Sequence, residues 1–217
     1  MIKYREQTVE KENTMSNYEI TKKRVQKEFA HYDHEKMIQK FHLESDENYL
    51  YMNFLSRRYR IHRVSGNVEW MEKEVVQEAG FHEVLTLFDV LCDSKDGCTT
   101  AGEYINMHSM SSIKGSSGNV GGSFFQEEAK LFNEQTEKLV KACEHLQGMP
   151  KGKGDVAYEI PVFEFLSFQI QFWEADEEFS ESLEIFVDKN ILQFMRYETM
   201  WYAVSHMLER VKEEMDF

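Results

Sequence analysis

Cysteine, proline and glycine are all scarce in this chain of 217 residues, which has 3 Cys, 2 Pro and 11 Gly. The cysteines, Cys92, Cys98 and Cys143, include no C-x-x-C pair. They therefore provide neither a disulfide framework nor the clustered thiolates of an iron–sulfur or structural zinc site. With so little proline and glycine, the chain also lacks the composition of a long disordered protein.

Positive charge is also in short supply, because 25 Lys and Arg face 39 Asp and Glu and the formal net charge is -14. A surface of this sign repels the phosphates of nucleic acids and anionic lipids, so we expect no nucleic-acid partner. No stretch approaches the roughly 20 apolar residues needed to cross a bilayer, and the N-terminal residues lack the apolar core of a signal peptide. We expect a soluble, cytoplasmic protein with no membrane partner. Its cofactors and oligomeric state stay unknown at this stage.

Large apolar side chains are abundant, with 16 Phe, 10 Tyr and 12 Met, and they are sufficient for a core. Residues 1–15 are polar and aperiodic, so we expect a flexible N-terminal tail followed by a single domain over 16–217. Ser16 and Asp33 are the expected N-caps of the first two helices, and Gly80 is a point at which the third could break. Apolar spacing predicts helices over 16–32, 33–41, 74–93, 124–146 and 196–214.

Alternating apolar and polar residues predict two groups of strands. The first group is a three-stranded meander over 48–55, 58–64 and 67–71, with a turn at Ser65-Gly66. The second is a C-terminal hairpin over 162–173 and 182–188, preceded by the internal linker MPKGKGD at 149–155. The predicted fold class is α+β, with an antiparallel or mixed β-sheet made from the meander and the hairpin and covered by amphipathic helices. Two sheets, one per half, are the alternative.

The hairpin connection is crowded with carboxylates, and the candidate ligand or metal surface consists of Glu174, Asp176, Glu178 and Asp188. If these side chains converged, they would offer the oxygen ligands that a hard cation needs, although the spacing is not that of an EF-hand. The favoured interpretation is internal ion pairing, because arginine suits bidentate carboxylate contacts. The candidate ion-pair arginines lie in the meander: Arg57, Arg58, Arg60 and Arg63. A solvated turn is the third interpretation, and the identity of any metal stays unknown.

The segment KGSSGNVGGS at 114–123 is a candidate anion-binding loop, with Gly118, Gly121, Gly122 and Ser123 as its residues. Small residues allow backbone N–H groups to approach a phosphate, and a helix expected to start at Ser123 would present its N-terminus. The segment is neither a Walker A motif nor a dinucleotide fingerprint, so a flexible connection is the favoured interpretation. No complete catalytic motif occurs among the histidines, cysteines and serines, and we assign no catalytic residue.

Several motifs resemble a family known only as domain of unknown function 3786, which occurs mostly in anaerobic bacteria and archaea. The resemblance covers roughly residues 17–212 and carries no established activity. Some members join this domain to a cysteine-rich iron–sulfur module that this chain lacks. Ala175 stands where the family pattern has glycine, and Val187 where phenylalanine is usual. The motifs are W-E-A-D-E-E-F (173–179), I-F-V-D (185–188), S-R-R-Y-R-I (56–61), S-G-N-V (65–68), T-T-A-G-E-Y-I-N (99–106) and G-G-S-F-F (121–125).

Two hypotheses for the function follow. The first is a non-enzymatic accessory domain of anaerobic metabolism that binds an unknown small molecule or protein partner, as the resemblance and the lack of a catalytic motif suggest. The second is a divalent-cation-dependent enzyme that acts on a phosphorylated small molecule at the acidic turn, with the glycine-rich loop holding the phosphate. The sequence alone does not decide whether the protein is an enzyme.

Overall fold

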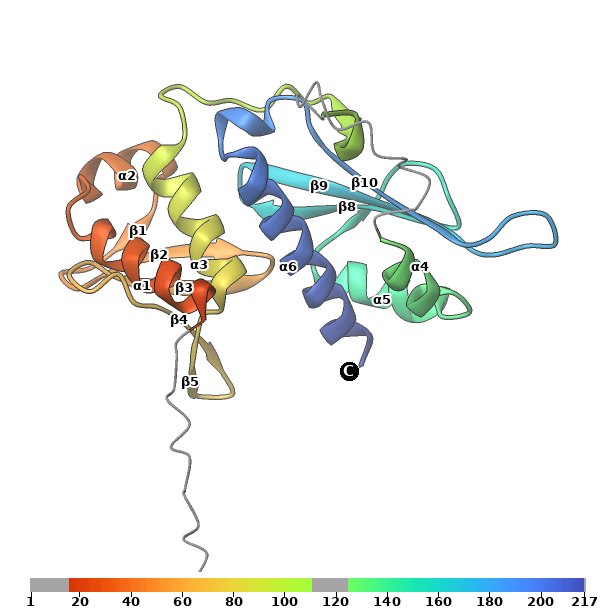
Figure 1. Cartoon of the computed structure of the whole chain (residues 1–217), viewed down its shortest axis with the longest axis horizontal. Helices are drawn as coiled ribbons and strands as arrows, with labels where there is room; N and C mark the ends of the chain where they lie inside the picture. The colour runs from red at the N-terminus through yellow and green to blue at the C-terminus, as the bar shows by residue number, and fades with distance from the viewer. Residues whose placement is uncertain (1–15, 111–124, 217) are drawn as a thin grey trace, which may run out of the picture.

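The computed structural model describes residues 16–110 and 125–216. Within these residues it contains six α-helices and two five-stranded antiparallel sheets, one in each half of the chain (Figure 1). The predicted α+β class with antiparallel strands is confirmed, and the meander and the C-terminal hairpin belong to separate sheets. The predicted tail at 1–15 and the glycine-rich segment at 114–123 lie outside the described residues.

The first sheet is a meander in which each strand pairs with the next along the chain. The predicted three strands are confirmed as β2, β3 and β4, and Gly66 lies in the turn between β3 and β4. The turns at Leu55-Ser56 and Lys73-Glu74 have positive φ at both residues, as a tight two-residue hairpin requires. The strand bounds are β1 Glu44–Ser45, β2 Tyr49–Phe54, β3 Arg57–His62, β4 Val68–Glu72 and β5 Val75–Glu78.

The predicted helix over 74–93 is wrong in its first part, where the chain forms β5. The turn at Lys73-Glu74 folds the β-branched residues Val75 and Val76 back along β4. Pairing with β4 stabilises these residues as a strand, although their apolar spacing also fits a helix. The helix begins only after Gly80, as α3 Phe81–Phe88, and it continues into a π-helical turn at Asp89–Asp93.

The second sheet has the order β6-β10-β9-β8-β7 and contains the predicted hairpin as β9 and β10. The predicted strand over 162–173 is in fact two strands, because the chain turns at Glu164-Phe165. The predicted linker at 149–155 contains β7 and leads directly into β8 of the same sheet, so it does not separate two units. The strand bounds are β6 Tyr104–Asn106, β7 Met149–Pro150, β8 Val156–Phe163, β9 Leu166–Trp173 and β10 Ser182–Asp188.

The expected helix caps are confirmed at the first two helices, where Ser16 and Asp33 accept hydrogen bonds from the backbone N–H groups of Glu19 and Lys36. The predicted helix over 124–146 is wrong as a single helix, because the chain breaks at Glu134, which has a positive φ. None of the helices in the described ranges is long and apolar enough to cross a membrane. The remaining helix bounds are α1 Asn17–Phe29, α2 His34–Phe41, α4 Gln126–Phe132, α5 Thr136–His145 and α6 Tyr197–Met215.

The two sheets meet at the ends of β2 and β8. Leu55 in the β2–β3 turn donates its backbone N–H to the carbonyl of Val162, at 3.0 Å, and the rings of Phe54 and Phe163 stack with centroids 4.9 Å apart. Helix α6 contacts both α3 and α5, and the buried apolar side chains of both halves form one cluster. These contacts agree with one domain over 16–217, which stays a prediction.

A buried polar chain crosses this core from β3 to α3 and α6. The Tyr59 hydroxyl donates to the Glu83 carboxylate and lies 3.3 Å from Nε2 of His206. His206 and His82 each lie 3.5 Å from the Glu209 carboxylate, and their hydrogen bonds lower the pKa of Glu209 to about 2. Burial and the neighbouring Glu83 raise the pKa of Tyr59 far above its usual value, so this hydroxyl acts as a neutral donor.

The lowered pKa of Glu209 predicts a specific loss of stability in acid. Its contribution is complete above the ordinary value of 4.5 and is lost as the pH falls toward about 2, because the unfolded chain takes up the proton first. At pH 6 we expect Glu209→Gln to lower the unfolding free energy by up to about 1 kcal/mol, since the carboxylate is half exposed and solvent screens it. Urea unfolding at pH 6, 4 and 2.5 should show this difference shrinking with pH. The exposed Glu137→Gln serves as the control, and a difference independent of pH would contradict the prediction.

Candidate functional site

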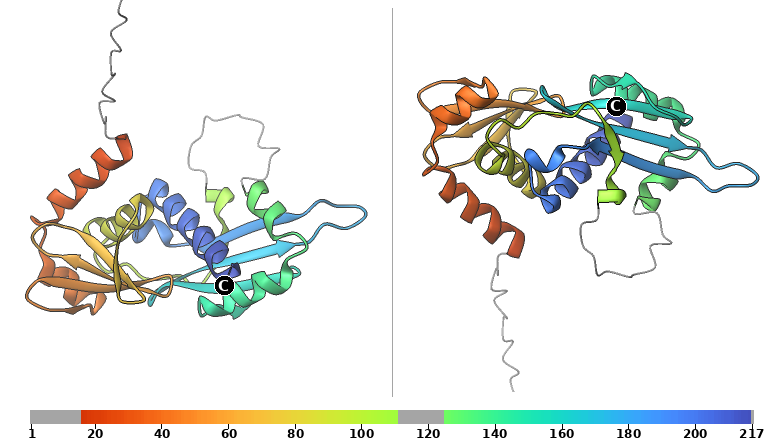
Figure 2. Two further views of the ribbon diagram at one scale, coloured as in Figure 1. Left: turned by 90° about the horizontal axis from the view of Figure 1, so that it is seen from below. Right: turned by 90° about the horizontal axis from the view of Figure 1, so that it is seen from above.

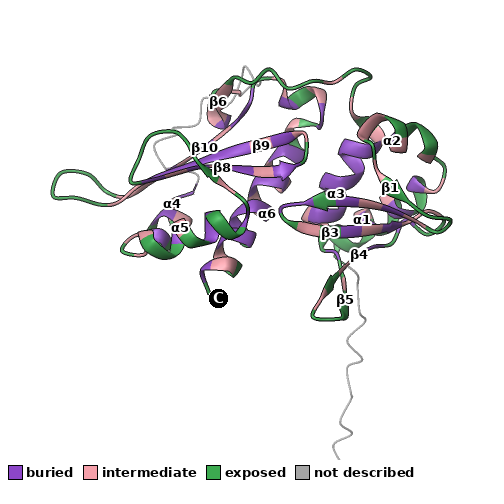
Figure 3. Ribbon diagram, turned by 180° about the vertical axis from the view of Figure 1, so that it is seen from behind, coloured by how far each residue is buried: buried purple, intermediate pink, exposed green. Residues whose placement is uncertain are grey.

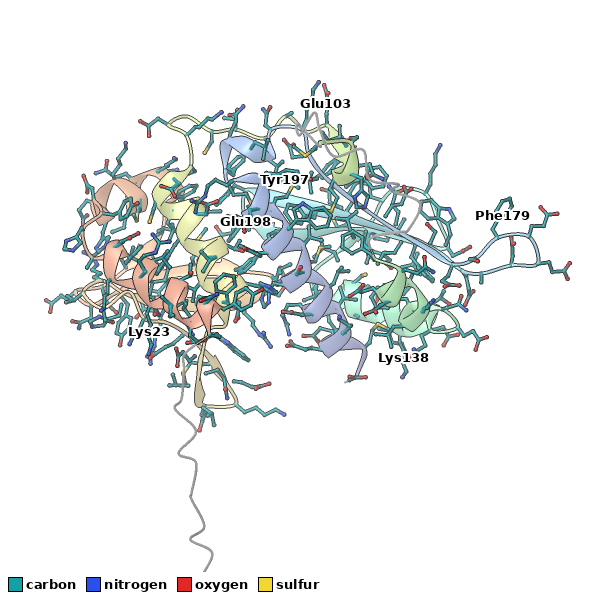
Figure 4. The ribbon with its side chains drawn as sticks, viewed as in Figure 1. Lys23, Glu103, Lys138, Phe179, Tyr197 and Glu198 are labelled. Atoms are coloured by element: carbon teal, nitrogen blue, oxygen red, sulfur yellow. The ribbon has the colours of Figure 1, made fainter. Side chains whose placement is uncertain are left out.

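The acidic turn at 174–178 lies in the loop that joins β9 to β10 and projects from the end of the second sheet (Figure 2). Asp176 uses its carboxylate within the loop, where Oδ1 accepts hydrogen bonds from the N–H groups of Glu178 at 2.8 Å and Phe179 at 2.7 Å. These two bonds lower the pKa of Asp176. Phe179 is 70% exposed, and Figure 4 shows it on the projecting loop.

Glu174 fastens the base of this loop to the break between α4 and α5. Its Oε1 accepts the N–H of Glu134 at 3.0 Å, and its own N–H donates to Asp155 Oδ2 at 2.7 Å. Beside it, the N–H of Ala175 donates to Oδ1 of Asn133, at 3.0 Å. The Glu174 carboxylate therefore bonds the backbone N–H of Glu134, and no ion pair joins it to an arginine in the described residues.

Asp188 lies at the opposite end of β10 from the acidic turn. Ser182 is paired with Trp173 beside the turn, and Val187 is paired with Phe168, so Asp188 is separated from the turn by the length of the strand, roughly 20 Å. The four carboxylates therefore do not meet at one place, as the metal-site interpretation required. In the parts of the chain that the structure describes, no group of three or more His, Cys, Asp or Glu side chains could hold a metal ion.

The predicted pairing of the meander arginines with the acidic turn is also wrong, although all four arginines form ion pairs. They belong to the first sheet and its turns, whereas the acidic turn projects from the far end of the second, where its residues are mostly exposed (Figure 3). Each arginine contacts a glutamate nearer to it in space. The pairs are Arg57 with Glu213 at 2.7 Å, Arg58 with Glu44 at 2.5 Å, Arg60 with Glu69 at 2.8 Å and Arg63 with Glu35 at 3.1 Å.

The candidate anion loop remains a prediction, because Gly118, Gly121, Gly122 and Ser123 lie outside the described residues.

An apolar hollow lies where the two sheets meet, and we call it the junction pocket. It has a volume of about 440 Å³ and is formed by residues 40–42, 97–100 and 164–165 together with Phe194. A smaller hollow of about 130 Å³ adjoins it and shares the walls at 41–42 and 164–165. The Asn53 amide donates to Glu164 Oε1 at 3.1 Å, which ties the wall at the β8–β9 turn to the first sheet.

Three phenylalanines form the apolar wall of the junction pocket. Phe165 stacks on Phe41 with ring centroids 5.0 Å apart and on Phe194 with centroids 5.5 Å apart. Phe194 is almost fully buried, whereas Phe41 and Phe165 are partly exposed toward the pocket. Offset-stacked aromatic pairs contribute roughly 0.5–1.5 kcal/mol each beyond their buried area, so the stacking stabilises this wall.

Polar groups surround this wall and come from three separate segments. Lys40 donates to the backbone oxygen and to Oγ of Ser94, both at 2.8 Å, so its ammonium group is fixed at the edge. His42 is exposed and has a left-handed backbone at φ 52°, which turns the chain at the end of α2. Cys98, in a loop, and Glu164, in the β8–β9 turn, also line the pocket. The thiol and the imidazole share the pocket without a hydrogen bond between them.

The sequence indicated the local setting of some residues of this site, but it did not show that they come together. The end of the second helix at Phe41 and the loop setting of the Cys98 thiol are visible locally, but no pattern joins residues 40–42 to 164–165. One local signal in the sequence is the run F-E-F at 163–165. It interrupts the alternation of apolar and polar residues in the predicted strand, and the chain turns at this point.

Comparison with known proteins gives one match. A family model described as Domain of unknown function (DUF3786) matches residues 33–210, so the match begins after α1 and includes every residue that lines the junction pocket. No curated protein and no solved structure matches the chain.

Proposed function

The chain belongs to the family described as domain of unknown function DUF3786, and from that premise we propose that it binds a flat, largely apolar small molecule in the junction pocket. The proposal describes a binding domain and includes no catalytic step. A role as an accessory domain of anaerobic metabolism is part of it and rests on the family resemblance alone.

The observation that supports this proposal is the aromatic wall of Phe41, Phe165 and Phe194 in a pocket of about 440 Å³. Small-molecule sites are typically concave, largely apolar and of roughly 300–1,000 Å³, and they favour the boundary between two structural units. A flat ligand gains both apolar burial and favourable ring contacts against such a wall. The groups at the rim, His42, Thr99 and Glu164, would then fix its orientation by hydrogen bonds.

A binding role also agrees with the chemistry at the rim. The Lys40 ammonium is committed to Ser94, and the Glu164 carboxylate accepts a hydrogen bond from Asn53. Neither the Cys98 thiol nor the His42 imidazole is hydrogen-bonded to the other, as an activated nucleophile and its base would be. No observation favours the alternative of a divalent-cation enzyme at the acidic turn, because Asp188 is remote and Asp176 is bonded to its own loop.

The proposal predicts stabilisation by a ligand that depends on Phe165. A thermal-shift screen with nucleotides, flavin mononucleotide and haem should yield a compound that raises the melting temperature by roughly 5–10 °C at a hundred times its dissociation constant. Phe165→Ala should weaken the binding of that compound at least tenfold, because it removes the central ring of the wall. Phe179→Ala, which removes an exposed ring on the projecting loop, is the matched control and should leave binding unchanged.

Alkylation of Cys98 provides a second readout that needs no variant. A compound in the junction pocket should slow the reaction of this thiol with a maleimide, because the thiol lines the same cavity. Cys92 lies elsewhere, and burial followed by the neighbouring Asp93 and Asp89 raises the pKa of its thiol, so it should react slowly with or without the compound. Equal affinities of Phe165→Ala and Phe179→Ala, or no protection of Cys98, would contradict the proposal.

A further inference from the structure

Helices α3 and α6 lie side by side, and a group of titratable side chains lies between them and β3 (Figure 1). We call this group the α3–α6 cluster, and its members are Tyr59, His82, Glu83, His206 and Glu209. Glu83 and His206 are buried, with 8% and 4% of their surface exposed, whereas His82 and Glu209 reach the surface. The cluster therefore extends from solvent into the core, and it shares no residue with the junction pocket.

Glu83 is a buried carboxylate that needs a positive partner. It accepts hydrogen bonds from the Tyr59 hydroxyl and from the backbone N–H of Gly80, and both donors are neutral. Burying a carboxylate is costly unless a cation compensates its charge. In the described part of the chain, the group that forms an ion pair with Glu83 is the imidazole of His206, whose Nε2 lies 3.8 Å from Oε1.

Both ring nitrogens of His206 face oxygen acceptors. Nε2 lies 3.3 Å from the Tyr59 hydroxyl oxygen, whose hydrogen is donated to Glu83. Nδ1 lies 3.5 Å from Oε2 of Glu209. A neutral imidazole has one N–H and one lone pair, so in either tautomer a lone pair would face an acceptor. Only the imidazolium supplies a donor on both sides.

Each element packed against His206 contributes to its surroundings. The Glu209 carboxylate is shared by two histidines, because Nδ1 of His82 lies 3.5 Å from its other oxygen. Arg57, which also acts on the cluster, is paired with a glutamate of α6 at 2.7 Å. Without the charge on His206, Glu83 has no ion-pair partner among the described residues. The groups around His206 are Tyr59 and Arg57 on β3, the ring of Phe54 on β2, His82 and Glu83 on α3, and Glu209 on α6.

We propose that the α3–α6 interface is a pH-sensitive switch whose closed state requires a proton on both ring nitrogens of His206. In the closed state the imidazolium joins Glu83 of α3 to Glu209 of α6. When it loses one proton, Glu83 is left buried without a cation, and α6 separates locally from α3. The switch opens as the pH rises through the titration of His206. It also weakens in strong acid, where Glu209, with its pKa of about 2, takes up a proton.

A run of neighbouring rings leads from His206 to the wall of the junction pocket. The ring centroids of His206 and Phe54 are 5.0 Å apart. Phe163 stacks on Phe54 at 4.9 Å and on Phe165 at 5.4 Å. Because protein interiors are closely packed, a movement at His206 displaces the rings in contact with it. The switch itself requires no ligand in the junction pocket.

The test uses the full chain without any ligand, between pH 6 and pH 9. Nitrogen-15 spectra of the imidazole groups should show His206 with both ring protons at pH 6 and with one proton at pH 9. The contact with the Phe54 ring assigns its signals. The opening constant for amide hydrogen exchange in α6 around His206 should rise at least tenfold with the same midpoint, because a buried ion pair is lost. This constant is corrected for the intrinsic dependence of exchange on base.

Two variants separate this histidine from the others. His206→Gln removes the titrating group, so its opening constant at pH 6 should be at least tenfold above that of the wild type and should not change with pH. His145→Gln is the matched control, because His145 also contacts α6, 3.5 Å from Glu214, but is exposed. It should keep the pH dependence of the wild type.

Three results in the wild type would overturn the proposal, whether or not His206→Gln folds. They are a single ring proton on His206 at pH 6, a protonation state that stays the same up to pH 9, and a titration of His206 without a change in the opening constant. None of these results bears on ligand binding in the junction pocket.

Discussion

Replacing Asp188 by alanine is expected to lower the unfolding free energy by about 3 kcal/mol or more. This carboxylate is almost fully buried at the end of β10. Its two oxygens accept hydrogen bonds from the backbone N–H groups of Ala101 and Gly102, both at 2.9 Å, and of Asn190 at 2.8 Å. Alanine removes all three charge-assisted bonds and leaves three backbone donors without their acceptor, which is costlier than the loss of the bonds alone.

The matched control is Asp176→Ala, because Asp176 also accepts two backbone hydrogen bonds but is exposed in the projecting loop. Water replaces the lost acceptor there, so we expect a loss below about 1 kcal/mol. Urea unfolding followed by circular dichroism compares the two variants directly. Similar small losses in both variants would show that the buried carboxylate does not hold the loop as the distances indicate.

The role of Asp188 also links the fold to the candidate ligand site. Two of the three N–H groups it binds, those of Ala101 and Gly102, belong to the loop that continues from residues 97–100, which line the junction pocket. The side chain of Asn190 adds a hydrogen bond to the carbonyl of Thr99, at 3.0 Å. Asp188→Ala should therefore weaken ligand binding in the junction pocket in addition to lowering stability.

Local signals in the sequence account for much of the fold. Ser16 and Asp33 cap their helices because each side chain reaches a backbone N–H three residues further on, which is visible in the sequence. The alternation in β9 and the apolar face of α6 were equally visible. The helix predicted at Val75 and Val76 is wrong because these residues form a strand by pairing with β4. The spacing of apolar residues along the chain carries no information about such pairing.

The candidate site could not be predicted in the same way, because its partners are far apart in the chain. The sequence left Glu174 with three interpretations, an arginine partner, a solvated turn or a metal site. In the structure it accepts the backbone N–H of Glu134, a residue predicted to lie inside an unbroken helix. Likewise, Phe41 and Phe165 are separated by more than a hundred residues, and only the meeting of the two sheets brings their rings together. Charge and periodicity describe what a segment can contact, whereas the fold decides which contact forms.

Replacing Gly66 by alanine is expected to have the other large effect, lowering the unfolding free energy by roughly 2–5 kcal/mol. Gly66 has φ +67°, and a Cβ there would lie 2.1 Å from the carbonyl oxygen of Gln26 in α1. Left-handed backbone strain contributes roughly 1–2 kcal/mol, and the overlap with the helix backbone adds roughly 1–3 kcal/mol.

The control for this substitution is Gly97→Ala, because Gly97 has nearly the same φ, +69°, and no atom within 4 Å of the added Cβ. It should show the strain alone, roughly 1–2 kcal/mol. The excess in Gly66→Ala then measures how tightly α1 is held against the β3–β4 turn. Hydrogen exchange should become faster along α1, because the added methyl group overlaps the helix backbone at Gln26. Equal losses in the two variants, with α1 still protected, would mean that the turn adapts to the methyl group and that α1 is not held by this contact.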